Sequence, residues 1–137
     1  MDDGEDTAFE EKVCRTVAYE RRIRDSSVVR KVKEMYDNAC QICNLRLEVS
    51  PGCEGHREAA HIQALGKPHG GPDRIGNVLC LCPTCHVLFD RGALQLTDDL
   101  KVVNGLTQRF ETALTVVEER RIKVECVRQH RARWADR

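Results

Sequence analysis

The stretch that decides the fold covers residues 58–92 and reads EAAHIQALGKPHGGPDRIGNVLCLCPTCHVLFDRG. It opens with a short segment that ends in His61, as expected of a strand that presents a polar side chain at its end. A second short apolar segment follows a glycine-rich loop. Pro83 and Gly92 then bracket a helix over roughly 83–91, because proline favours the first position of a helix and glycine the position just past its end. The stretch therefore predicts a strand, a second strand and a helix, in that order.

Two cysteine pairs of the form CxxC occur in this region, Cys40 with Cys43 and Cys82 with Cys85. Two intervening residues let both sulfurs of a pair reach one metal, and two such pairs complete a tetrahedral thiolate shell that selects zinc. The segment between the pairs, residues 44–81, is longer than in ribbon-like zinc sites. We therefore predict a structural Zn²⁺ that holds both ends of a functional segment.

The other cysteines are most simply packing residues. Cys14 and Cys126 lie on apolar helix faces, and Cys80 lies on the second predicted strand. Two alternatives stay open at this point: Cys80 could exchange into the zinc shell, or Cys53 and His56 could form a metal-binding pair of their own.

A second site is indicated on the predicted helix, where His86 and Asp90 are four residues apart and share a face. That face is rotated about a quarter turn from the cysteines, so one helix can serve two sites. An imidazole beside a carboxylate suits a harder divalent cation that contacts phosphate. His61 on a strand, Asn77 before the next strand and His86 on the helix complete the polar set.

In this order, His61, Asn77 and His86 resemble the signature residues of the HNH endonucleases, whose ββα-metal motif is strand, strand and helix. The segments EAAHI, PHGGPD and LCLCPTCHVLFDRG most resemble the corresponding segments in the HNH domains of bacterial modification-dependent (type IV) restriction enzymes. The resemblance covers about residues 36–96, and the tail VECVRQHRARW resembles a helix that often closes such domains. It implies an α+β fold in which a four-cysteine zinc site staples the motif, flanked by N-terminal and C-terminal helices.

The resemblance also implies roles. His61 would be the general base, and His86 would ligate a catalytic divalent metal such as Mg²⁺, Mn²⁺, Ni²⁺ or Co²⁺. Asn77 would either orient the His61 ring or hold the two strands in place. Asp90 takes a position where other members carry a histidine ligand, although it could instead serve to cap and pack the helix end.

One position departs from the family pattern. Many HNH enzymes carry a metal ligand just before the general base, and this chain has Ala60 there. Either water and phosphate fill the metal shell, or Glu58, two residues back on the same strand face, supplies the ligand. His69 and His130 are expected to be loop and surface residues.

Composition sets the wider limits. The 137 residues carry 22 Lys+Arg and 22 Asp+Glu, but residues 1–12 hold six acids and a single base, so the remainder is net positive. With no apolar run long enough for a membrane span and no secretory signal, the sequence predicts a cytoplasmic protein.

The pattern along the chain predicts helices over about 7–38, with a break at 25–27, and again over 106–134. The segment LQLTDDLKVV predicts a hairpin. The expected organisation is an acidic leader with N-terminal helices over 1–35, a zinc-stapled nuclease domain over 36–105 and a C-terminal helical segment over 106–137.

The function predicted is a metal-dependent HNH endonuclease that cleaves DNA in bacterial restriction or defence. The alternative is a zinc-stapled nucleic-acid-binding or adaptor module with an inactive HNH shell. DNA is the expected partner, and cutting both strands implies a homodimer or sequential nicks. A reader of modified DNA would have to lie on a longer parent chain or on another protein.

Overall fold

The computed structural model describes residues 25–48, 56–117 and 120–135 of the chain. The first element in them is helix α2, Ser27–Met35. The Ser26 hydroxyl accepts a hydrogen bond from the Val29 amide at 3.1 Å, which satisfies one of the amides that a helix start leaves unpaired. The second of the two predicted N-terminal helices is therefore confirmed, and the first lies outside the described residues.

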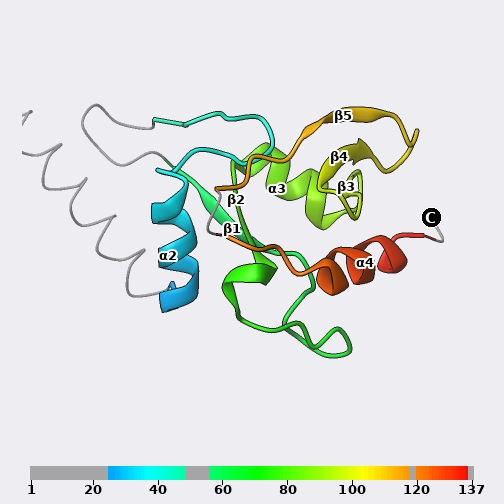
Figure 1. Cartoon of the computed structure of the whole chain (residues 1–137), viewed down its shortest axis with the longest axis horizontal. Helices are drawn as coiled ribbons and strands as arrows, with labels where there is room; N and C mark the ends of the chain where they lie inside the picture. The colour runs from blue at the N-terminus through cyan, green and yellow to red at the C-terminus, as the bar shows by residue number, and fades with distance from the viewer. Residues whose placement is uncertain (1–24, 49–55, 118–119, 136–137) are drawn as a thin grey trace, which may run out of the picture.

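The centre of the structure is an antiparallel pair of strands, β1 (Glu58–His61) and β2 (Val78–Leu81). Directly opposed residues share a face of this hairpin, and successive pairs alternate between the two faces. Ala59 opposes Cys80, and this pair packs against α2; Ala60 opposes Leu79, and this pair joins the larger core that includes Phe89 of the next helix. Figure 1 shows α2 on one side of the hairpin and α3, the three-stranded sheet and α4 on the other.

Helix α3 follows β2 directly and spans Pro83–Asp90, as the sequence predicts. The Cys82 sulfur caps it by accepting from the Cys85 amide at 3.5 Å. Gly92, just past the end, has a φ of +76°, and a Cβ there would lie 2.5 Å from the Trp134 ring. Glycine is thus required at this position both by the backbone conformation and by the close approach of the tail. A short 3₁₀ helix, η1 (Ile75–Asn77), precedes β2.

A three-stranded antiparallel sheet follows, formed by β3 (Leu94–Leu96), β4 (Lys101–Asn104) and β5 (Phe110–Ala113). The β3–β4 hairpin is the predicted one. The expected helix over 106–134 is wrong for its first part, because Asn104 caps a turn by accepting from the Leu106 and Thr107 amides and the chain returns as β5. The helical spacing was misleading: Leu106 and Phe110 are exposed and form no core stripe.

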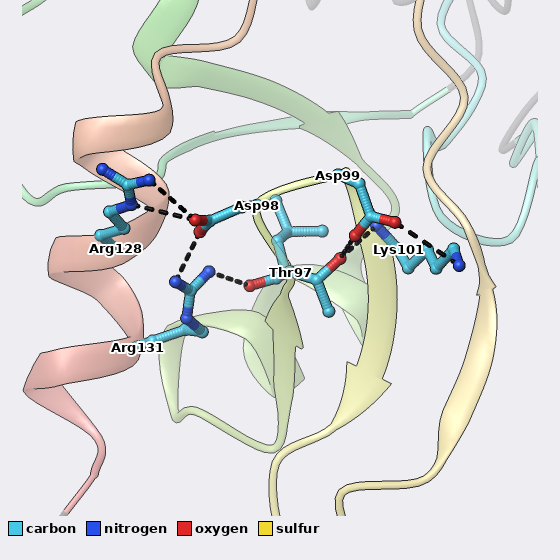
Figure 2. Close-up of polar contacts among 7 residues, drawn as sticks. Thr97, Asp98, Asp99, Lys101, Arg128 and Arg131 are labelled. Atoms are coloured by element: carbon cyan, nitrogen blue, oxygen red, sulfur yellow. Dashed lines mark hydrogen bonds and ion pairs between the residues drawn. The ribbon is translucent and has the colours of Figure 1, made fainter.

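The chain ends in α4, Val124–Arg133, which packs beside β3 through the buried Cys126 and Val127. Figure 2 shows its outer contact with the β3–β4 turn: the Asp98 carboxylate accepts from Arg128 at 2.9 Å and from Arg131 at 2.6 Å. Arg131 also donates to the Leu96 carbonyl at 2.8 Å.

The predicted fold class is confirmed as mixed α and β with the strand, strand, helix motif at its centre. In the described part of the chain, no helix has the length and apolar character needed to cross a membrane. The predicted division into segments 1–35, 36–105 and 106–137 stays a prediction.

Candidate active site and zinc site

The four cysteines of the two CxxC pairs come together at one end of the β1–β2 hairpin. Cys40 and Cys43 lie in the turns after α2, and Cys82 and Cys85 lie at the start of α3. Their ligand atoms all lie within 4.8 Å of one another, and the Cys43 and Cys82 sulfurs are 3.7 Å apart. A tetrahedron of ~2.3 Å Zn–S bonds has sulfurs about 3.8 Å apart, so the cluster fits zinc.

Cys80 is not part of this cluster. It is fully buried on β2, and burial raises the pKa of its thiol to about 11, which keeps it neutral in the core. Cys126 is likewise a buried core residue. The alternative of Cys53 pairing with His56 cannot be traced, because Cys53, like Cys14, lies outside the described residues.

Gln41, inside the first cysteine pair, anchors that pair to the rest of the domain. Its buried side-chain oxygen accepts from the Cys80 amide at 2.8 Å and from Arg120 at 3.0 Å, and its amide donates to the Thr115 carbonyl at 2.9 Å. Its backbone amide donates to the Cys80 carbonyl at 2.9 Å. Nothing in the sequence distinguishes this glutamine from an exposed residue of a zinc knuckle, so sequence reasoning missed it.

On the other side of α3, His86 lies between two carboxylates. Its Nδ1 is 2.7 Å from Glu58 Oε1, and its Nε2 is 3.1 Å from Asp90 Oδ2. The second Glu58 oxygen is 3.1 Å from His56 Nε2. The structure thus brings together His86, Asp90 and Glu58, and it adds His56 as a neighbour of Glu58.

His61 ends β1, and its Nε2 lies 3.0 Å from Asp73 Oδ1. Asn77 is fully buried, and its side chain makes its hydrogen bonds to backbone. The side-chain oxygen accepts from the Gln63 amide at 2.8 Å, while the side-chain amide donates to the carbonyls of Gln63 at 2.9 Å and Pro72 at 2.8 Å. These contacts hold the loop that follows β1, and the predicted role of Asn77 stays a prediction.

Comparison with known protein families identifies the region that contains these residues. A family model described as HNH endonuclease matches residues 40–97, a span that begins at the first zinc cysteine and ends just after β3. Residues 40–97 are an HNH domain. The three residues singled out from the sequence, His61, Asn77 and His86, lie within its strand, strand, helix core, and their roles stay predictions.

Among solved structures, the chain is similar to a modification dependent TagI restriction endonuclease, with a TM-score of 0.75 and 43% sequence identity. The likeness covers 81% of this chain and 38% of that one, so the chain spans well under half the length of this neighbour. No curated protein matches the sequence.

The contacts of His86 with the two carboxylates shift the pKa values of all three groups. Contact with Asp90, supported by Glu58 and opposed by burial, raises the pKa of His86 to about 9. The His86 contact in turn lowers the pKa of Asp90. Burial acts to raise the pKa of Glu58, but its hydrogen bonds with His86 and His56 outweigh burial and lower it.

These contacts match the usual form of a histidine ligand, in which one ring nitrogen faces the metal and the other is held by a carboxylate. His86 Nε2 and Asp90 form a pair that could bind the ion, and Glu58 already occupies Nδ1. Glu58 as a direct ligand stays a prediction.

His130 differs from its prediction. It is not a surface residue but is 3% exposed on α4. Its ring stacks on Phe89 with centroids 3.9 Å apart, and its Nε2 is 2.8 Å from the Phe89 carbonyl. The sequence does not indicate this burial, because a single buried histidine in an arginine-rich helix produces no periodic hydrophobic pattern. His69 is half-buried in the loop between β1 and η1, as expected of a loop residue.

Proposed function

We propose that this HNH domain is a metal-dependent endonuclease that hydrolyses phosphodiester bonds in DNA. The observation that carries the proposal is the joint presence of a candidate base, His61, at the end of β1 and a carboxylate-flanked His86 on α3. Membership of the HNH family and the likeness to a restriction endonuclease support it.

In the proposed mechanism, the lone pair of the neutral His61 ring takes a proton from the attacking water. The water oxygen bonds to phosphorus, and the bond from phosphorus to the 3′ oxygen breaks. This leaves a 5′-phosphate and a 3′ oxyanion, which takes a proton from solvent to become the 3′-hydroxyl. A divalent ion held by His86 and Asp90 would offset charge on the scissile phosphate and the leaving oxygen. Asn77 keeps the loop after β1 in place during the reaction, and Glu58 holds the His86 ring.

We further propose that the domain acts in bacterial restriction, in the cytoplasm. Because this chain spans 38% of the modification-dependent neighbour, recognition of modified DNA would belong to another part of a longer protein or to a partner. One motif cuts one strand, so double-strand cleavage would need a homodimer or two successive nicks.

The central test is plasmid cleavage by zinc-loaded protein with Mg²⁺, Mn²⁺, Ni²⁺ or Co²⁺, for the wild type and His61→Ala. We expect metal-dependent nicking that His61→Ala lowers about 10²- to 10⁴-fold, the usual contribution of a general base. His69→Ala is the matched control, because it removes a histidine side chain but keeps the backbone carbonyl that accepts from Gln63, so it should leave the rate unchanged. An intact wild type that nicks with none of these ions would contradict the proposal.

The same preparation decides the alternative function. If the domain is an inactive binding module, it will shift duplex DNA in a binding assay but cut nothing. Parallel assays on modified and unmodified duplexes test specificity, and we expect little discrimination by this domain alone, because contacts to phosphates carry no base readout.

A further inference from the structure

The loop between β1 and η1, residues 62–74, is held in one conformation by hydrogen bonds around Asn77. In addition to the three side-chain bonds of Asn77, the Ile62 amide donates to the Asn77 carbonyl at 2.9 Å. Gln63 reaches across the loop and donates to the His69 carbonyl at 2.6 Å. These contacts fix both ends of the loop, at Gln63 and at Pro72.

The two sides of the loop also approach closely at Gly71. Its amide donates to the Ala64 carbonyl at 2.7 Å, and a Cβ at this position would lie 2.0 Å from the Gln63 carbonyl oxygen. Any larger residue would force the sides apart. The backbone that leads into Asp73 is therefore closely constrained although the Asp73 side chain itself is 39% exposed.

Asp73 is directed from this loop to the candidate base. Its Oδ1 lies 3.0 Å from His61 Nε2, and the histidine side chain is 20% exposed. An ionised carboxylate can only accept a hydrogen bond, so the contact requires the proton of the neutral ring to be on Nε2. The lone pair of that ring is then on Nδ1.

We propose that Asp73 is a positioning residue for His61, and that Asn77 acts on the base through the loop that carries Asp73. The carboxylate fixes the ring orientation and leaves Nδ1 as the basic nitrogen. This inference rests on the proposed nuclease function, because it assigns a partner to the base of that reaction.

The proton balance is simple. Nδ1 takes one proton from water as the oxygen bonds to phosphorus, and the ring becomes an imidazolium with protons on both nitrogens. Asp73 keeps its hydrogen bond to Nε2 and offsets the positive charge without taking up a proton itself. The imidazolium later returns its Nδ1 proton to solvent.

The kinetic test measures single-turnover cleavage and DNA affinity for Asp73→Ala and Asp73→Asn. We expect Asp73→Ala to lower the rate constant about 10- to 100-fold with little change in DNA affinity, since a partly exposed partner contributes less than a buried one. The rate constant of Asp73→Asn should lie between those of the wild type and Asp73→Ala, because the asparagine carbonyl can still accept from Nε2 but carries no charge. Asp37→Asn is the matched control: it removes the same charge from an 83% exposed site paired with Arg46 and should behave as wild type.

A spectroscopic test does not depend on activity. In zinc-loaded protein at a pH where the ring is neutral, we expect a ¹H–¹⁵N signal from His61 Nε2–H, assigned by its absence in His61→Gln. The signal should be lost in Asp73→Ala through exchange with water, while zinc content and melting temperature stay at wild-type values.

Three results would overturn the inference: an unchanged rate constant in Asp73→Ala, a His61 signal that survives the substitution, or a loss of rate that excess divalent metal restores, which would make Asp73 a metal ligand. If the wild type cuts no DNA, the nuclease proposal fails. The spectroscopic result still decides whether Asp73 fixes the ring.

Discussion

At the scale of single residues, the core of this domain depends on polar side chains in buried positions. Gln41 and Asn77 are fully buried, and each satisfies its amide with backbone or buried partners. Such residues are costly to replace, because removing one partner leaves the others buried and unpaired. His130 is also buried; its Nε2 contacts the Phe89 carbonyl, whereas its Nδ1 has no hydrogen-bond partner among the described residues, and its contribution to stability depends on pH.

We predict that His130 makes the domain less stable in mild acid. Burial lowers the pKa of His130; the Phe89 carbonyl and Asp90 oppose this, while Arg133 and Arg131 add to it. Above the unfolded pKa of about 6.5 the ring is neutral in both states. Below it the unfolded chain binds a proton that the folded chain resists, so the free energy of unfolding falls as pH falls toward the lower, folded pKa.

The measurement is urea unfolding at pH 7.5 and pH 5.0 for the wild type and His130→Gln, whose amide can still donate to the Phe89 carbonyl. Other groups titrate in both proteins, so the difference between them isolates His130. A glutamine variant with the same pH dependence as wild type would contradict the assignment.

At the scale of elements, α4 is attached to the β3–β4 turn by both packing and charge. Asp98 accepts from Arg128 and Arg131, while its neighbour Asp99 contacts Thr97 and Lys101 of its own hairpin (Figure 2). Both arginines lower the pKa of Asp98. Because the pairs are exposed, they contribute little to global stability.

We therefore predict that Asp98→Asn loosens α4 locally without unfolding the domain. Amide hydrogen exchange in the second half of α4 should accelerate about two- to fivefold, whereas β1 and β2 should be unchanged. Asp99→Asn is the matched control, since it removes an identical charge one residue away with no contact to α4. Equal effects of the two substitutions would show that general charge, rather than this contact, is responsible.

At the scale of the whole molecule, the cysteine cluster joins the turns after α2 to the start of α3. Structural zinc contributes about 10–16 kcal/mol in small zinc domains, as much as or more than the ~5–15 kcal/mol that stabilises a typical domain. The fold is therefore expected to depend on the metal.

We predict that a strong zinc chelator, or Cys43→Ser, abolishes cooperative unfolding. The well-dispersed native NMR spectrum should collapse to the narrow chemical-shift range of an unfolded chain. Cys126→Ala removes a buried thiol outside the cluster and should retain one zinc per chain and a cooperative transition. A zinc-free protein that still unfolds cooperatively would contradict the structural role of the site.

The sequence alone determined the motif, because the motif depends on local spacing. The CxxC pairs, the helix between Pro83 and Gly92, and the shared face of His86 and Asp90 all follow from a few residues. The family resemblance had the same basis, since the signature residues lie within one short stretch.

Only the tertiary structure decided which distant residues meet. Asp73 reaches His61 across a folded loop, Gln41 meets Arg120, and His130 stacks on Phe89. None of these pairs has a periodic signal, because each depends on how separate elements pack. For the same reason, the apparent helical spacing of Leu106 and Phe110 was misleading: a pattern of apolar residues implies a core only if another element covers it, and in this structure both are exposed.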